Sequence, residues 1–156
     1  MIFIGVDPGL DGALAAVTPD GAAVWDTPTV RLAKGRRDYL VPEMAALLLP
    51  HAGGGVVAIE RVGARPGQGV TSMFTFGKGF GIWLGLLAAL GVPYDLVTPQ
   101  KWQKALGVAG DKGSHRLRAS QLFPSLAHEL RLASHDGRAD ALLLAEFMRR
   151  QYAGRG

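Results

Sequence analysis

Four acidic side chains lie where a carboxylate could do chemistry. Asp7 ends the apolar run IFIGV, and Glu60 ends the apolar run VVAI. Asp136 and Asp140 lie four residues apart near the start of a C-terminal segment with a helical pattern, so both can share one face. Three of these residues also have a possible structural role. Asp7 precedes a Pro-Gly pair and could simply be a turn residue. Asp136 could cap the helix, and Asp140 could interact favourably with the positive end of the helix dipole.

Convergence of these carboxylates would have a chemical consequence. Side chains at the carboxyl ends of neighbouring parallel strands emerge at the same edge of a sheet. Three or four carboxylates gathered there would repel one another unless cations neutralised them. Oxygen ligands of this kind suit Mg²⁺ or Mn²⁺, and paired ions serve in-line phosphoryl displacement. The acidic residues therefore predict a metal-dependent phosphoryl-transfer site.

The elements that must position these residues follow from periodicity and turn signals. We expect strands at 2–7, 13–18, 22–27, 56–60 and 93–98, and helices at 38–49, 70–90, 99–106, 114–122 and 137–152. Asp38 is a possible cap of the first helix. Residues 61–69 and 107–113 are glycine-rich and are expected to be a surface loop and a linker. This order predicts an α/β fold with a mixed five-stranded sheet, antiparallel at first and then parallel, flanked by helices.

Length and composition limit the classes of protein to which the chain could belong. A chain of 156 residues is expected to form one domain over 1–156 with a sizeable core. It has no cysteine, which excludes disulfides, thiolate metal sites and cysteine nucleophiles. We expect no membrane segment, no small-molecule cofactor and an intracellular, cytoplasmic location. The net charge of +4 is modest but compatible with a polyanionic partner.

Three motifs carry a family resemblance that covers nearly the whole chain. IGVDPGLDGALAAV, VVAIERV and HDGRADALLLAEF, in this order, resemble the catalytic motifs of RuvC-type Holliday junction resolvases of the ribonuclease H-like superfamily. TPQKWQKALGVAGDKG is similar to the lysine-bearing segment between the second and third motifs. The compact length and the form of the last motif look most like the resolvase-like proteins of bacteriophages.

The resemblance implies specific roles. Asp7, Glu60, Asp136 and Asp140 would form the catalytic, metal-binding cluster, with two Mg²⁺ ions that Mn²⁺ could replace. The last two acids are three apart in the cellular proteins but four apart here, and Asp140 matches the final one. The remaining ligand is therefore Asp136 or its neighbour His135, which could also assist catalysis. The resemblance also implies a ribonuclease H-like fold and a homodimer, for which the apolar stretch 81–90 is a candidate interface.

Basic and aromatic residues around these motifs are candidates for DNA contacts. Helical spacing places some of the basic side chains on one face, where they could contact phosphates. Apolar side chains near residue 74 could wedge between unstacked DNA bases. A solvated basic surface, and packing of the aromatic residues in the core or at a subunit contact, are the structural alternatives. The candidates are Arg61, Arg65, Met73, Phe74, Lys78, Lys101, Lys104, Lys112, Arg116 and Arg118.

The expected function is a structure-selective endonuclease that resolves Holliday junctions or other branched DNA by paired nicks, in recombination, repair or phage DNA processing. One alternative is a broader ribonuclease H-like nuclease acting on flaps, forks or RNA–DNA hybrids. Another is a branched-DNA binding module without catalysis. A sugar kinase of the actin-like type is a weaker alternative, because those proteins are far longer.

Overall fold

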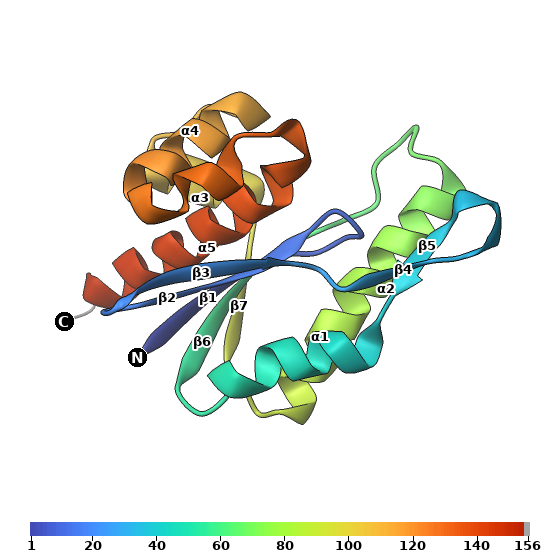
Figure 1. Ribbon diagram of the computed structural model, residues 1–156, viewed down its shortest axis with the longest axis horizontal. Coiled ribbons are helices and arrows are strands. Elements are labelled where there is room, and N and C mark those ends of the chain that lie inside the picture. Colours follow the sequence, from blue (N-terminus) through green and yellow to red (C-terminus); the bar gives the residue numbers. More distant parts are fainter. Residues whose placement is uncertain (155–156) are drawn as a thin grey trace.

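A mixed sheet of five strands forms the centre of the computed structural model, which describes residues 1–154 (Figure 1). The strands are β1 (Ile2–Asp7), β2 (Ala13–Thr18), β3 (Gly21–Asp26), β6 (Gly55–Glu60) and β7 (Tyr94–Val97), in the order β3-β2-β1-β6-β7. The first three pair antiparallel, whereas β6 runs parallel to both β1 and β7. The predicted five-stranded mixed sheet is confirmed.

Helices cover both faces of this sheet (Figure 1). The helices α1 (Val41–Leu48) and α2 (Val70–Ala89) lie on one face, and α3 (Pro99–Leu106), α4 (Lys112–Leu122) and α5 (Asp136–Ala153) lie on the other. Alternation along the strands sends Ile4, Val6 and Leu14 into the first layer and Ala13 and Ala15 into the second. Two hydrophobic cores therefore hold the sheet between them.

The close approach of α5 to β1 depends on Gly5. A Cβ at this residue would lie 1.9 Å from the carbonyl oxygen of Ala141 and 2.6 Å from the amide of Ala145. Only a residue without a side chain allows the helix to lie so near the strand. This contact sets where the N-terminal turns of α5 meet the end of β1.

A small β-hairpin replaces the first part of the helix expected at 38–49. Its strands are β4 (Thr29–Arg31) and β5 (Arg37–Tyr39), and α1 begins only at Val41. The prediction of Asp38 as a helix cap is wrong, because Asp38 lies in β5 and its Oδ1 accepts hydrogen bonds from the Tyr39 amide and Lys78. Pro42 is compatible with the helix here because it falls in the first turn.

The remaining elements differ little from expectation. The helix predicted at 114–122 begins at Lys112, because Asp111 caps it: its Oδ2 accepts a hydrogen bond from the Ser114 amide at 2.8 Å. Short 3₁₀ helices that were not predicted complete the described chain at Ala33–Gly35, Leu49–His51, Pro124–Leu130 and Ala133–His135.

Helix α2 is long and apolar enough to cross a membrane by length and composition alone, although little of it is buried. It buries Trp83 and Leu87 in the core on its face of the sheet, and Gly79 against the Tyr39 ring of the hairpin. It connects β6 to β7, which pair parallel with each other. We therefore interpret α2 as a crossover helix with an uncovered apolar side.

Candidate active site

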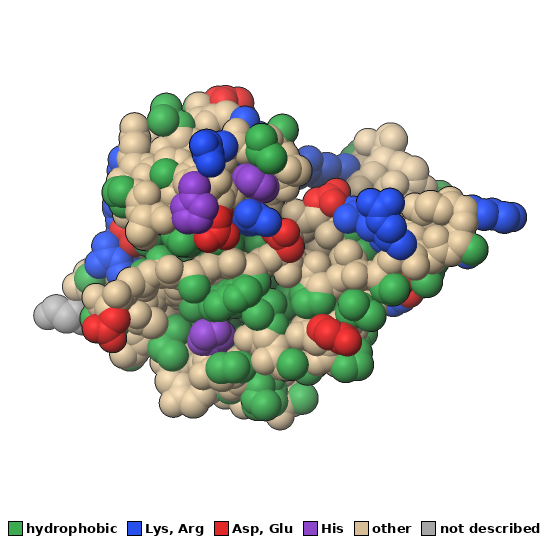
Figure 2. All heavy atoms as spheres, in the orientation of Figure 1, with side chains coloured by type: hydrophobic (Ala, Val, Ile, Leu, Met, Phe, Trp, Pro, Cys, Tyr) green, Lys and Arg blue, Asp and Glu red, His purple; other side chains and the backbone are tan. Residues whose placement is uncertain are grey.

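Three of the predicted carboxylates meet at one edge of the sheet. Asp7 and Glu60 end the parallel neighbours β1 and β6, whose register pairs Val6 with Ile59. Asp140 reaches the same edge from the second turn of α5 and is 1% exposed. Figure 2 shows acidic, basic and histidine side chains gathered on one face over α4 and the start of α5.

Burial and mutual repulsion act on these carboxylates together. Burial raises the pKa of Asp7 well above its usual value, and the negative charges of Asp140 and Glu60 raise it further. Burial also raises the pKa of Glu60, against the opposing hydrogen bond from Trp102, and Asp140 adds to the rise. Carboxylates that resist ionisation in this way are stabilised by any cation that enters among them.

Lys112, the second residue of the stretch DKG, supplies positive charge beside the three carboxylates. Its ammonium forms an ion pair with Asp140. Burial alone would lower the pKa of Lys112, but the charges of Asp140, Asp7 and Glu60 raise it above its usual value. The ammonium thus stays protonated and partly neutralises all three acids.

Two further side chains orient the acids, and the sequence reasoning did not identify either. The Trp102 indole Nε1 on α3 donates a hydrogen bond to Glu60 Oε2 at 2.9 Å. His115 on α4 is 1% exposed, and its Nδ1 lies 2.7 Å from Asp140 Oδ1 while its Nε2 donates to the Ala109 carbonyl at 2.9 Å. The Trp102 and His115 rings pack edge to face, with centroids 4.9 Å apart. Apolar periodicity alone gave no signal for either hydrogen bond.

Asp136 lies apart from this group. It forms an ion pair with Arg116 and keeps about 30% of its side chain exposed. It is not among the charges that shift the pKa of Asp7 or Glu60. His135 Nδ1 accepts a hydrogen bond from the Leu132 amide at 3.3 Å, and partial burial followed by the charge of Arg138 lowers its pKa. The predicted fourth ligand, whether Asp136 or His135, stays a prediction.

The donor chemistry of the site fits a divalent cation. Within residues 1–154, no three His, Asp or Glu side chains form a ready-made metal-binding cluster. Asp7, Glu60 and Asp140 nevertheless offer carboxylate oxygens that repel one another, and the Lys112 ammonium occupies the place of a cation beside Asp140. Such a set of oxygen ligands suits Mg²⁺ or Mn²⁺.

The loop 61–69 forms a depression directly beside Glu60. Arg61 and Arg65 are exposed on it and line a hollow of about 640 Å³ together with Phe76 and Gln100. Their guanidinium groups make no ion pair with any residue of the described chain, so they are available to an anionic ligand.

Helix α2 carries the predicted apolar wedge residues with different exposure. Phe74 is 74% exposed, whereas Met73 is half-buried, and both line a shallow hollow with Phe80. Lys78 is engaged: its Nζ lies 2.6 Å from Asp38 Oδ1 of the hairpin. The structure therefore leaves Phe74 free to contact a ligand.

Some of the basic side chains of α3 and α4 form ion pairs, and others do not. Lys101 and Lys104 are exposed on α3, and Lys101 Nζ lies 5.8 Å from the centre of the Phe147 ring. Lys112 and Arg116 are paired with Asp140 and Asp136 as described above. Arg118 has a buried Nε that no acceptor of residues 1–154 meets.

Comparison with curated sequences finds a related resolvase. The chain is 35% identical over 117 residues to the Holliday junction resolvase MOC1, chloroplastic, from Chlamydomonas reinhardtii. The alignment covers 71% of this chain but 13% of that relative, so the chain spans only a small part of the relative's length. No protein-family model matches the sequence.

Comparison with solved structures finds the same architecture. RuvC of T. thermophilus in complex with a Holliday junction substrate has a TM-score of 0.64 and 21% identity, covering 100% of this chain and 96% of that chain. A second Thermus thermophilus RuvC structure has a TM-score of 0.58 and 23% identity, with 97% of each chain covered. These likenesses show that the fold is the RuvC type, as predicted.

The raised pKa of Asp7 generates a stability prediction. The folded protein binds the proton of the Asp7 carboxyl group more tightly than the unfolded chain does. The stability that this bound proton contributes is therefore lost as pH rises through the raised pKa. In metal-free buffer, Asp7→Asn should therefore raise the free energy of unfolding by about 1 kcal/mol at pH 7 and by less near pH 4. Urea unfolding at both pH values measures this. Asp20→Asn, in the exposed β2–β3 turn, is the control; a loss of stability in Asp7→Asn at pH 7 would contradict the prediction.

Proposed function

Because the chain belongs to the RuvC-type family of Holliday junction resolvases, we propose that it is a metal-dependent endonuclease that resolves four-way DNA junctions by paired nicks. The observation that carries this proposal is the convergence of Asp7, Glu60 and Asp140 at one sheet edge, each buried or half-buried. A purely structural role would not explain why Asp7 and Glu60, both with a raised pKa, lie beside the buried Asp140. DNA recombination or the processing of phage DNA is the context that we infer.

The chemistry is hydrolysis of a phosphodiester. Water attacks phosphorus in line with the leaving 3′ oxygen, the P–O3′ bond breaks, and the 3′ oxygen takes up a proton, which gives a 5′-phosphate and a 3′-hydroxyl. Two Mg²⁺ or Mn²⁺ ions, when bound, would supply Lewis acidity for the attacking water and the leaving oxygen. Asp7, Glu60 and Asp140 would hold these ions, and Asp136 or His135 would complete the set.

The residues around the acids have separate tasks in this proposal. Trp102 holds Glu60 in one orientation, and His115 does the same for Asp140. Lys112, which pairs with Asp140 at the acidic edge, would offer its ammonium to the entering phosphate. Arg61, Arg65, Lys101 and Lys104 would contact phosphates on either side without reading the sequence.

Two alternative functions share part of this arrangement. A broader ribonuclease H-like nuclease would cut flaps, forks or RNA–DNA hybrids with the same acids. A branched-DNA binding module would keep the basic surface but not the chemistry. The convergence of three repelling carboxylates, two of them held by hydrogen bonds, favours catalysis, because a site that had lost its chemistry would be under no constraint to keep these charges.

The substrate proposal predicts a defined cleavage pattern. With Mg²⁺ or Mn²⁺, the protein should nick a mobile four-way junction symmetrically and faster than a flap or a hybrid, as measured on end-labelled substrates in denaturing gels. Asp7→Asn and Asp140→Asn should bind the junction with little change but lose at least about 10²-fold in rate, because they remove metal ligands. Rapid cleavage of the hybrid alone would favour the broader nuclease, and junction binding without nicking in either metal would favour the binding module.

The indole hydrogen bond to Glu60 predicts a milder defect. Trp102→Phe keeps an aromatic ring against His115 but removes the Nε1 donor, so the Mn²⁺ concentration needed for half-maximal cleavage should rise about 10-fold or more. Trp25→Phe, beside His51 and remote from the acids, should leave that concentration unchanged. The same metal dependence for both variants would show that the hydrogen bond has no role in holding the site.

We further propose that the active form is a homodimer that pairs its α2 helices. Gly77, Gly81 and Gly85 form an exposed small-residue ridge on α2, and a Cβ at any of them would meet nothing within 4 Å. A two-fold dimer would match the near two-fold symmetry of a four-way junction. The uncovered apolar side of α2 is the surface that such a dimer would bury.

The dimer proposal predicts the effect of a bulky side chain on this ridge. Gly81→Phe should convert a dimer into a monomer without loss of helix signal, because the added ring meets no atom of its own chain. Light scattering after size exclusion, with circular dichroism, measures both properties. Gly53→Phe, in the open turn before β6, should remain dimeric. A wild-type protein that is monomeric both alone and on the junction would exclude this arrangement.

A further inference from the structure

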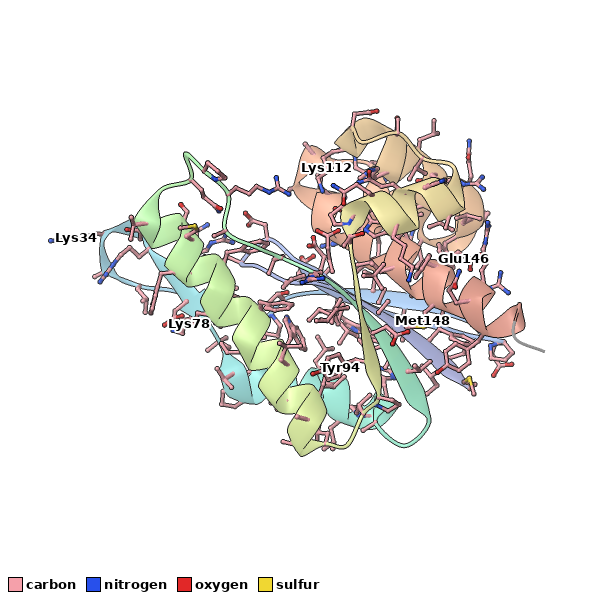
Figure 3. The ribbon with its side chains drawn as sticks, turned by 180° about the vertical axis from the view of Figure 1, so that it is seen from behind. Lys34, Lys78, Tyr94, Lys112, Glu146 and Met148 are labelled. Atoms are coloured by element: carbon pink, nitrogen blue, oxygen red, sulfur yellow. The ribbon has the colours of Figure 1, made fainter. Side chains whose placement is uncertain are left out.

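The β4–β5 hairpin carries a group of bases that none of the preceding functions uses. Its connecting segment reads RLAKGRR from Arg31 to Arg37, and residues 31–36 are all exposed. Lys34 stands at the outer end of the hairpin, in a left-handed backbone conformation with φ of 59° (Figure 3). Lys and Arg side chains project at the outer end of this part of the surface (Figure 2).

Three of these bases have no acidic partner. Arg31, Lys34 and Arg36, which we call the hairpin bases, make no ion pair with any residue of the described chain 1–154. The other two cations of this region are engaged, since Arg37 Nη2 lies 2.5 Å from Asp11 Oδ1 and Lys78 pairs with Asp38. The positive charge of the hairpin tip is therefore uncompensated and open to a polyanion.

The hairpin is held firmly although its strands have only three residues each. An isolated two-stranded hairpin is marginally stable in water. Here Tyr39 is 6% exposed and its hydroxyl donates to the Thr75 carbonyl at 2.9 Å, with the ring so close to Gly79 that a Cβ there would lie 2.3 Å from the Tyr39 oxygen. At the tip, the Leu32 amide donates to the Arg36 carbonyl at 2.7 Å. The hairpin bases are thus presented by a rigid element, which lowers the entropy cost of binding.

The hairpin is also coupled in space to the acidic edge. Arg37 binds Asp11 in the turn that directly follows Asp7 at the end of β1. Lys112 is ion-paired with Asp140 at this edge, and Lys34 lies well apart from Lys112 at the outer end of the hairpin (Figure 3). Ion pairs therefore connect both α4, through Lys112, and the hairpin, through Arg37, to the region of the acidic edge. A duplex whose phosphate enters the acidic edge would meet positive charge from both elements.

We propose that the hairpin bases bind the phosphate backbone of a duplex DNA arm next to the strand that is cut. This inference rests on the proposed function and adds a binding surface to it. The contacts would be electrostatic and independent of sequence, and each phosphate neutralised would release counterions. Their role would be to hold the arm in register with Asp7, Glu60 and Asp140.

The test is junction binding by a variant that loses two hairpin charges. Lys34→Gln/Arg36→Gln changes exposed side chains without partners, so folding should be unaffected. Binding is measured by fluorescence anisotropy on a four-way junction without metal, in an Asp7→Asn background that prevents cleavage. We expect Kd to rise roughly 10-fold near 0.1 M salt, and the slope of log Kd against log salt to fall by about 2.

Matched variants separate local contact from bulk charge. Lys34→Arg/Arg36→Lys keeps both charges and should bind as the parent does. Arg150→Gln removes one charge at the far end of α5, where Glu146 keeps Arg149 as a partner, and should weaken binding less than Lys34→Gln alone. Equal effects of these two single variants would overturn the proposal, as would an unchanged Kd and salt slope in Lys34→Gln/Arg36→Gln.

The outcome is distinguishable from failure of the proposed function. If the unmodified protein neither binds nor nicks a junction, the function is wrong; if it does both and the hairpin variant binds equally well, only the hairpin proposal is wrong. Anionic phospholipid vesicles provide the remaining comparison. Vesicle binding that depends on Lys34 and Arg36, with junction affinity unchanged, would replace DNA by a membrane surface as the partner and overturn the proposal.

Discussion

The repulsion among Asp7, Glu60 and Asp140 is the constraint on which the rest of the site depends. Three carboxylates removed from water at one sheet edge cannot all ionise unless positive charge lies among them. In this structure Lys112 supplies that charge, because its ammonium pairs with Asp140 and is stabilised by all three acids. A site arranged in this way is costly without a cation and prepared to accept one. This is the physical basis of our proposal that the site catalyses a metal-dependent reaction on a polyanionic substrate.

The scaffold resists that repulsion through packing on both sides of the sheet. Parallel pairing of β1 with β6 brings the first two acids together, and the absence of a side chain at Gly5 lets α5 carry Asp140 to the same edge. Behind the acids, the Trp102–His115 pair forms a buried layer that fixes two of the three carboxylates by hydrogen bonds. The ends of α3 and α4 are therefore as much a part of the site as the sheet itself.

The parts of the fold that could be predicted are those with strong local signals. Strands bounded by turn residues, such as 2–7 and 13–18, and the long helix at 70–90 agree with the structure within one residue. The hairpin was missed because the segment before α1 has an apolar helical pattern, whereas its conformation is set by distant contacts of Asp38 with Lys78 and of Tyr39 with Thr75. Hydrogen bonds between residues so far apart in the chain produce no periodic pattern in the sequence.

The sequence by itself determined which residue types were available for chemistry and at which strand and helix ends they stand, because those ends follow from local turn and cap preferences. It therefore indicated four acids, Asp7, Glu60, Asp136 and Asp140, as candidates for one site. Only the tertiary structure decided their surroundings: that Lys112 neutralises the acids, that Asp136 pairs with Arg116, and that a basic hairpin flanks the site. The physical reason is that burial and electrostatic interaction depend on distances between segments far apart in the chain, which only packing brings together.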